Sequence, residues 1–327
     1  MTQAVQLLGI SNAIVDVLTH VDTEFLEGIG AAPGSMTLID QQKARDIYKQ
    51  MGPATEMSGG SVANTIAGFA NLGGTAAYIG KVKADQLGAI FDHDMRSLGV
   101  DIRLTPALEG APTARCHVLI TEDGQRTMQT YLGSCLELGL ADITEETVGS
   151  PKVILLEGYV WDIAEGPALA RKAAEIGRKN GTAIALSLSD SFCVERHRDS
   201  FVDFVRNDAD IVVADEDEAF ALLGTNTFEE TLEALRDYDN LFAVTRSEKG
   251  SVVIRNDEKV VQAATPVTDV IDTTGAGDAY CAGFLFGWAN GEPPEKCARY
   301  GTYCATMVIQ QLGGRIEAGV LDDFESH

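Results

Sequence analysis

The chain has 327 residues, of which 45% are hydrophobic, and its formal net charge at pH 7 is -24. This length and apolar content permit a large buried core, which predicts a globular protein rather than a disordered one. The negative charge argues against nucleic acid and anionic membrane surfaces as partners, because both require clustered lysine and arginine. The negative charge does not exclude a nucleotide ligand, because a phosphate site needs only a few local donors and a metal ion can neutralise part of the phosphate charge.

Six cysteines are scattered without a Cys-x-x-Cys pair, and they are predicted to be reduced core residues. The amino terminus lacks a basic segment followed by a long apolar run, and no window reaches transmembrane length. The sequence therefore predicts a cytoplasmic protein.

The first apolar run, residues 6–12, predicts a buried strand whose carboxyl end carries Asn12 and, slightly later, Asp16. Ligands bind at that end of the strands in parallel α/β sheets, so both residues are candidate ligand contacts. An ordinary turn explains them equally well. Residues 15–37 are broken repeatedly by glycine and proline, a composition that fits a small lid better than a core.

Gly59 and Gly60 precede an amphipathic helix that ends at Gly73-Gly74. The two leading glycines would let a substrate approach the backbone. Asn64 lies in the first turn of this helix, where an amide side chain serves either as a structural cap or as a ligand contact.

The middle of the chain alternates short apolar runs with helical patterns, which signals parallel strand pairing. Expected strands cover residues 75–82, 100–103, 153–159, 183–189 and 211–214, and expected helices cover residues 85–98, 167–179 and 196–205. A hairpin is predicted at residues 115–131, with Arg126 just past its turn, where most arginines are solvated. Tyr159 ends one strand, and its ring would either stack on a flat base or pack against the lid.

Asp215 and Glu218 follow a strand end and open a helix, where acidic residues also complement the helix dipole. A strand at residues 241–246, a hairpin of residues 251–255 and 260–264, and a last long helix at residues 295–311 complete the pattern.

Residues 270–287 crowd glycines, hydroxyls and a carboxylate just before an apolar helical pattern. The first N–H groups of a helix are unpaired and carry partial positive charge, and Gly275 and Gly277 leave room for a close approach, so this helix start suits a phosphate. Asp278 is poorly placed as a phosphate ligand but well placed to take a proton from a hydroxyl nucleophile. The alternative is a first-turn acid that complements the helix dipole.

Two stretches of the chain resemble a known family. Asp272-Thr273-Thr274-Gly275-Ala276-Gly277-Asp278 resembles the C-terminal signature of the ribokinase, or PfkB-type, carbohydrate and nucleoside kinases, and Gly59-Gly60-Ser61-Val62-Ala63-Asn64 resembles their N-terminal signature. The stretch at residues 186–192 is more similar to the adenosine kinases of that family than to ribokinases. The resemblance implies one α/β domain over residues 1–327, with a ribokinase-like three-layer α/β/α fold, a mostly parallel sheet and a small β lid formed mainly by residues 14–40 and 103–131.

The resemblance also implies roles for single residues. Asp278 is expected to be the base, with N–H groups of Gly275, Ala276 and Gly277 stabilising the phosphoryl group and Arg126 reaching it. The expected acceptor-binding residues are Asn12, Asp16, Gly59, Gly60, Asn64 and Tyr159. The expected ATP contacts are Thr245, Ser247, Gly250 and Thr302. The expected metal contacts are Glu218 and Asp215 for Mg²⁺ through water, and Asp272 and Thr274 for a monovalent cation such as K⁺.

Together these features predict an ATP-dependent phosphotransferase acting on the primary hydroxyl of a nucleoside, with adenosine, converted to AMP, as the leading acceptor. A kinase of a free sugar such as ribose or fructose is the first alternative. The second is a non-catalytic nucleoside or nucleotide sensor, because Asp215 replaces the asparagine and Ser247 the glycine usual in the family. An exposed lid strand also offers an edge through which two subunits could pair as a homodimer.

Overall fold

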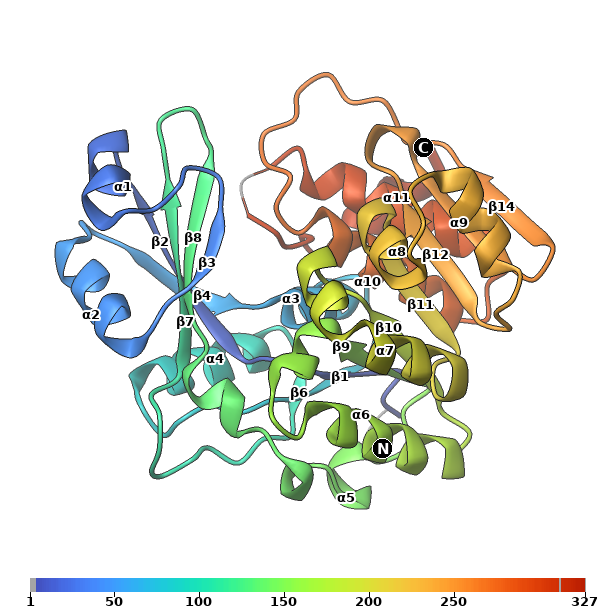
Figure 1. Cartoon of the computed structure of the whole chain (residues 1–327), viewed down its shortest axis with the longest axis horizontal. Coiled ribbons are helices and arrows are strands. Elements are labelled where there is room, and N and C mark those ends of the chain that lie inside the picture. Colours follow the sequence, from blue (N-terminus) through green and yellow to red (C-terminus); the bar gives the residue numbers. More distant parts are fainter. Residues whose placement is uncertain (1–3, 312, 327) are drawn as a thin grey trace.

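A nine-stranded sheet forms the centre of the body of the molecule, and a five-stranded sheet forms a lid beside it (Figure 1). The computed structural model describes residues 4–311 and 313–326. In spatial order the main sheet contains β14 (Glu258–Gln262), β13 (Ser251–Arg255), β12 (Leu241–Thr245), β11 (Ile211–Asp215), β10 (Ala183–Ser187), β9 (Val153–Glu157), β1 (Leu7–Ile10), β5 (Ala76–Ile79) and β6 (Asp101–Ile102). Neighbours from β6 to β12 are parallel, and β13 and β14 add an antiparallel hairpin at one edge. The predicted mostly parallel sheet is confirmed.

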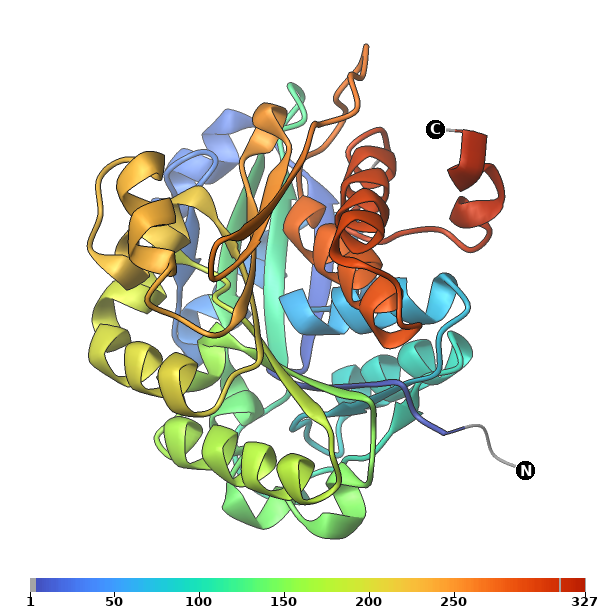
Figure 2. The ribbon, with the colours of Figure 1, turned by 90° about the vertical axis from the view of Figure 1, so that its right-hand side faces the viewer.

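Helices cover both faces of this sheet (Figure 2). One face packs against α3 (Ser61–Asn71), α4 (Gln86–Ser97), α10 (Ala276–Ala289) and α11 (Pro294–Val308). The other packs against α5 (Glu145–Val148), α6 (Gly166–Lys179), α7 (Ser191–Asn207), α8 (Glu216–Leu223) and α9 (Phe228–Leu235). Strand β1 shows the reason: Leu7 is buried with the first set and Leu8 and Ile10 with the second, because successive side chains point to opposite faces. The predicted three layers are confirmed.

Several expected boundaries shift in the structure. Strand β9 ends at Glu157, because the chain turns there into a 3-10 helix, so Tyr159 stands on that helix and not on a strand. Helix α7 begins at Ser191 instead of residue 196, because the Asp190 side chain accepts the Cys193 N–H at 2.9 Å and caps an earlier start. The short 3-10 helices are η1 (Gly133–Glu137), η2 (Leu140–Asp142), η3 (Gly158–Asp162), η4 (Ser247–Lys249) and η5 (Val320–Ser326).

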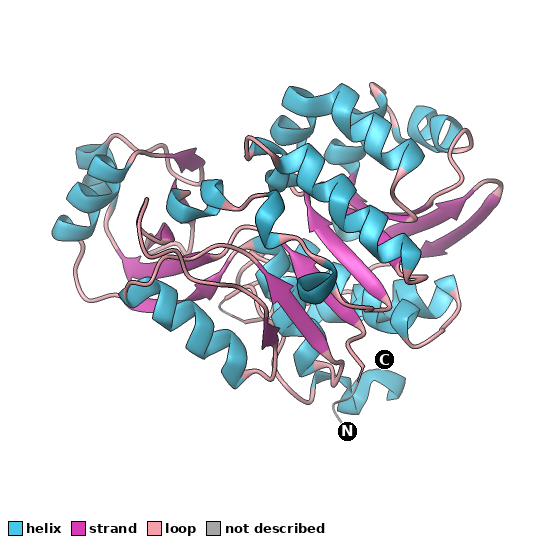
Figure 3. Ribbon diagram, turned by 90° about the horizontal axis from the view of Figure 1, so that it is seen from below, coloured by secondary structure: helices cyan, strands magenta, loops and turns pink. Residues whose placement is uncertain are grey.

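The lid lies to one side of the body (Figure 3). Its strand order is β3 (Met36–Leu38), β8 (Arg126–Tyr131), β7 (Ala114–Ile120), β2 (Ile14–His20) and β4 (Thr55–Gly59). Along the chain, α1 (Thr23–Ile29) connects β2 to β3, and α2 (Gln41–Gln50) connects β3 to β4. Strand β4 lies outside the ranges expected for the lid, since it has little apolar content of its own and is held by antiparallel pairing with β2. The chain returns from β4 directly into α3, so Gly59 and Gly60 stand at the junction of lid and body.

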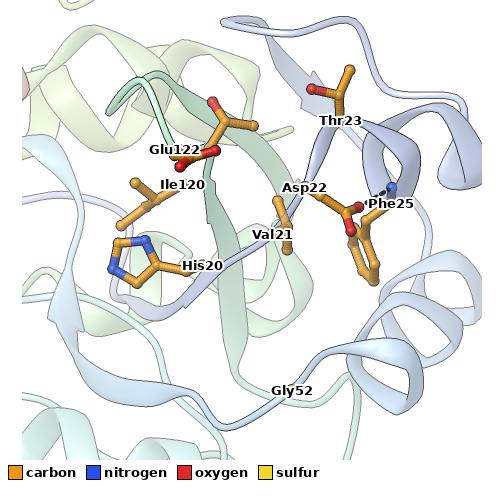
Figure 4. A pocket seen from close by; sticks show the side chains of 9 residues that line it. His20, Val21, Asp22, Thr23, Phe25, Gly52, Ile120 and Glu122 are labelled. Carbon is orange, nitrogen blue, oxygen red and sulfur yellow. Dashed lines mark hydrogen bonds between the residues drawn. The ribbon is translucent and has the colours of Figure 1, made fainter.

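A cavity of about 580 Å³ opens at the end of β2 and β7 that lies away from the body (Figure 4). His20, Phe25 and Glu122 are among its lining residues, and Asp22 accepts the Phe25 N–H at 2.8 Å to cap α1. None of the predicted site residues lines it. Within residues 4–311 and 313–326, no helix combines the length and the apolar character needed to cross a bilayer.

Candidate active site

A cavity of about 720 Å³ lies where the lid meets the carboxyl ends of the central strands. The lid lines it largely with apolar side chains, among them Met36, Leu38 and Met128. Polar side chains also line it, among them Asp16 from the lid strand β2 and, from the body, Asn12, Ser61, Asn64, Glu157 and Asp278. The cavity is therefore lined partly by apolar and partly by polar side chains, and we call the polar residues named above its floor.

Asp278 occupies the first turn of α10 and lines this cavity. Its Oδ1 accepts the Ser61 hydroxyl at 2.6 Å, and its Oδ2 accepts the Asn64 amide at 3.2 Å. Burial raises the pKa of Asp278 to about 6, while the two hydrogen bonds and the charge of Arg315 oppose that rise. The carboxylate is therefore ionised at neutral pH and basic enough to accept a proton.

This environment predicts how activity depends on pH. We expect kcat/KM to fall as the pH drops below about 6, because Asp278 then gains a proton and cannot accept one. Burial also raises the pKa of Asp16 to about 6, so two interacting carboxylates protonate in the same range and the fall is steeper than for one group. Initial rates with saturating ATP across this range measure it, and a flat profile down to about pH 5 would contradict a base with the pKa of Asp278.

The loop before α10 forms the expected anion site. Gly275 is the N-cap residue and has a φ of 73°, in the left-handed region that favours glycine. Outside its own helix no described heavy atom lies within 4 Å of the Cβ position at Gly277, so the first turn is open to a ligand. The Ala276 N–H, predicted to contact phosphate, donates instead to the Thr273 carbonyl at 3.2 Å. The open amides are thus those further into the turn, which lack intrahelical acceptors.

Arg126 reaches this loop from the first residue of β8. Its guanidinium forms an ion pair with Asp272, and the two side chains are only 9% and 5% exposed. Asp272 also accepts the N–H groups of Thr274 and Gly313, each at 3.0 Å. Arg126 is therefore beside the anion site but bound to a carboxylate, and both Asp272 oxygens already hold donors. This arrangement does not favour the predicted cation contact at Asp272.

The predicted acceptor residues come together at the polar floor. Asn12 donates its backbone N–H to Glu157 at 3.1 Å, and its buried Oδ1 has no partner among the described residues, so it can accept a hydroxyl from a ligand. Gly60 lines the cavity with a φ of 97°. A Cβ at Gly59 would lie 2.3 Å from Asp16 Cγ, so Gly59 makes room for the Asp16 carboxylate and not, as expected, for the substrate.

Tyr159 stands on η3 and lines the same cavity. The ring is half-buried, and its hydroxyl donates to the Ser189 carbonyl at 3.4 Å. Phe192 lies on the same wall and is 69% exposed. Two aromatic rings from the body thus line the cavity together with the apolar side chains of the lid.

The predicted ATP contacts lie outside this cavity, and three of them, Thr245, Ser247 and Gly250, lie at or just after the end of β12. Thr245 pairs with Asp215 at the ends of neighbouring parallel strands, which brings the expected ATP and Mg²⁺ contacts together. Ser247 has a φ of 51°, so the backbone keeps the left-handed conformation that the usual glycine would adopt. Gly250 has a φ of 85° and closes the turn. On α11, Thr302 Oγ1 is buried and has no partner among the described residues, which suits a ligand contact.

Asp215 and Glu218 form a capping box at the start of α8. Asp215 Oδ1 accepts the Glu218 N–H at 2.7 Å, and Glu218 Oε2 accepts the Asp215 N–H at 2.9 Å. One oxygen of each carboxylate remains for a hydrated ion. Burial raises the pKa of Glu218 to about 8, which a nearby Mg²⁺ would offset by favouring the carboxylate. Two carboxylates that act together with phosphates are a usual way to hold Mg²⁺.

Two residues of the floor, Ser61 and Glu157, were not predicted, and neither was Arg315, which contacts Asn64. Burial raises the pKa of Glu157 to about 8, so at neutral pH it carries a proton and can donate to a hydroxyl. Its position at the end of the apolar run 153–157 was a usable signal, as was the place of Ser61 next to Gly60. No sequence pattern marks Arg315.

A buried carboxylate next to an open helix start, together with two acids at the start of a neighbouring helix, is an arrangement compatible with phosphoryl transfer to an alcohol. Residues 28–318 match the pfkB family of carbohydrate kinases. The chain belongs to this family, and it is an ATP-dependent kinase of nucleosides or sugars.

Solved structures and characterised relatives agree with this class. The chain is similar to the adenosine kinase of Sinorhizobium meliloti, at 46% identity with 99% of each chain covered and a TM-score of 0.91. It is also similar to a probable sugar kinase of Rhizobium etli, at 42% identity with 99% and 98% covered and a TM-score of 0.91. The 5-dehydro-2-deoxygluconokinase of Clostridium perfringens is 25% identical over 278 residues, which cover 81% of this chain and 82% of that protein.

Proposed function

We propose that the protein transfers the terminal phosphoryl group of ATP to the primary hydroxyl of a nucleoside, with adenosine as the leading acceptor. The observation that carries this proposal is the combination of polar and aromatic residues that line the cavity. Its lining includes polar residues around Asp278 that suit a ribose, and it also includes the aromatic rings of Tyr159 and Phe192, which suit a flat base. A free sugar would use only the floor.

In the proposed reaction Asp278 accepts the proton of the primary hydroxyl as the hydroxyl oxygen bonds to the terminal phosphorus, and the bond from that phosphorus to ADP breaks. Asp16 and Asn12 accept hydrogen bonds from the other ribose hydroxyls, and neutral Glu157 donates one. The open amides of the first turn of α10 stabilise charge on the transferred group. Mg²⁺, held through water by Asp215 and Glu218, would neutralise charge on the ATP phosphates. Closure of the lid would keep water, a competing acceptor, from the site.

Two predictions stay open beside this reaction. K⁺ near Asp272 and Thr274 would require Asp272 to release donors that it now holds, and no step above depends on that ion. A homodimer through the lid would use β3 or β4, which are the outer strands of the lid sheet.

An acceptor panel tests the substrate. With ATP consumption as the readout, we expect kcat/KM for adenosine to exceed that for ribose and fructose by about 10- to 100-fold, because stacking of one base on aromatic side chains contributes about 1–3 kcal/mol. Guanosine and inosine in the same panel show how far the base is discriminated. A preference for a free sugar would overturn the nucleoside proposal, and tight nucleoside binding with no ATP consumption would identify a sensor.

A further inference from the structure

Arg315 connects the site to the chain segment that follows α11. It is a half-buried arginine whose guanidinium contacts three separate elements. Its Nε donates to Asn64 Oδ1 on α3 at 3.2 Å, and its Nη1 donates to Asp94 Oδ2 on α4 at 3.3 Å. Its Nη2 donates to the hydroxyl of Ser58 on β4 at 2.7 Å and also to the Ser58 carbonyl. The side chain therefore links the lid strand β4 to the helices α3 and α4 of the body.

The contact with Asn64 determines which way that amide faces. A guanidinium has only donors, so the Asn64 atom that meets Arg315 must be the oxygen. The Asn64 NH₂ group then points the opposite way and donates to Asp278 Oδ2 at 3.2 Å. If the amide turned over, its oxygen would face the carboxylate and the two acceptors would repel each other. Arg315 thus selects the orientation in which Asn64 supports the base.

We propose that Arg315 is a positioning residue for phosphoryl transfer, which holds Asn64 in the orientation that donates to Asp278 and so fixes the carboxylate toward the acceptor hydroxyl. This inference rests on the proposed function of Asp278 as the base. Ser61 holds the other carboxylate oxygen, so Arg315 acts on one side of a base that is held from two sides.

The charge of Arg315 supports the same role. The charged groups that face it are Asp94, Asp16 and Asp278, and Arg126 is the other cation that acts on Asp16. The positive charge of Arg315 opposes the rise in pKa that burial causes in both Asp16 and Asp278. Removing it raises both pKa values, so the base becomes protonated at a higher pH and activity is lost earlier on acidification.

The test compares R315M and R315K with the wild-type protein, and R96M serves as the matched control. Arg96 lies on α4, is half exposed, and pairs with Asp92 at 3.0 Å away from the cavity. We expect R315M to lower kcat about 10²-fold with little change in KM for ATP, because the base is misplaced while the ATP contacts remain. The acidic limb of its kcat/KM profile should move up by about one pH unit.

In R315K the pH of the acidic limb should stay at its wild-type value, because an ammonium group keeps the positive charge. Its kcat should still fall about tenfold, because lysine lacks the planar set of donors with which the guanidinium binds several partners. R96M should change neither.

A double-mutant cycle tests whether Arg315 acts through Asn64. If it does, adding R315M to N64A lowers kcat far less than R315M lowers it in the wild-type background. Additive effects would show that Arg315 does not act through this amide and would overturn the proposal. Should R315M fail to fold, R315K enters the cycle in its place.

Two further outcomes would overturn it. One is an R315M variant with wild-type kcat and an unmoved acidic limb. The other is a lower melting temperature with an unmoved limb, which assigns Arg315 a structural role alone.

The failure of this inference can be told apart from the failure of the proposed function. If the acceptor panel selects a sugar, the same profiles are measured with that sugar. If no acceptor is phosphorylated, the proposed function fails, and ¹³C NMR titration of the Asp278 carboxyl in wild type and R315M still reads the effect of Arg315. An upward shift in R315M supports the inference, and an unchanged titration overturns it.

Discussion

Replacing Asp278 by asparagine is expected to lower kcat by about 10³-fold, within the 10²- to 10⁴-fold range that a positioned general base contributes. Asparagine has nearly the same shape, so the cavity is kept while the proton acceptor is lost. The dissociation constant for ATP should change little, because Asp278 is proposed to contact the acceptor hydroxyl and not the nucleotide. Steady-state kinetics and calorimetric titration with ATP measure the two effects separately.

The variant N71A is a suitable control for this substitution. Asn71 ends α3 and donates to the Ile316 carbonyl at 2.7 Å, on the same helix as Asn64 but outside the cavity. It tests whether a general disturbance of α3 is enough to lower turnover. Turnover of the Asp278→Asn variant within a few-fold of wild type would refute the base.

Replacing Gly275 by alanine is expected to destabilise the protein by roughly 3 kcal/mol and to abolish most activity. A left-handed backbone costs a non-glycine residue about 1–2 kcal/mol. In addition, a Cβ at Gly275 would lie 2.5 Å from both the Cα and the carbonyl oxygen of Gly314, which is backbone that cannot rotate away. The loop must therefore shift, and the amides that follow it leave the position where they stabilise a phosphate. Urea unfolding and kcat measure the two consequences.

Substitutions at two other glycines separate the effect on stability from the effect on activity. Gly291 has a φ of 78°, and apart from its chain neighbours no heavy atom of the described residues lies within 4 Å of its Cβ position. G291A should therefore show only the conformational cost, about 1 kcal/mol, with activity retained. Gly277 has an open Cβ position as well, so G277A should keep its stability but weaken ATP use, because the methyl group faces the incoming phosphate. Equal stability of G275A and G291A would contradict the proposed contact with Gly314.

The sequence alone determined the class of the protein and the centre of its site. Periodicity was enough to predict parallel pairing of strands that alternate with helices, because buried parallel strands and amphipathic helices each carry a local apolar pattern. The resemblance to the kinase family implied the three-layer arrangement. The stretch around Gly275 and Asp278 was enough to predict an anion site with a base, because a helix start and its glycines have local physical properties. The family match confirms the class that these features predicted.

Only the tertiary structure decided how that centre is held. Ser61 meets Asp278 across 217 positions of the chain, and Arg315 meets Asn64 across 251. Arg126 pairs with Asp272 instead of standing free, and β4 joins the lid although its own sequence is nearly featureless. Such contacts depend on how α3, α10 and the lid pack together. Periodicity reports which face of an element is buried but not which residue of another element it will meet, so these partners become visible only when the chain is folded.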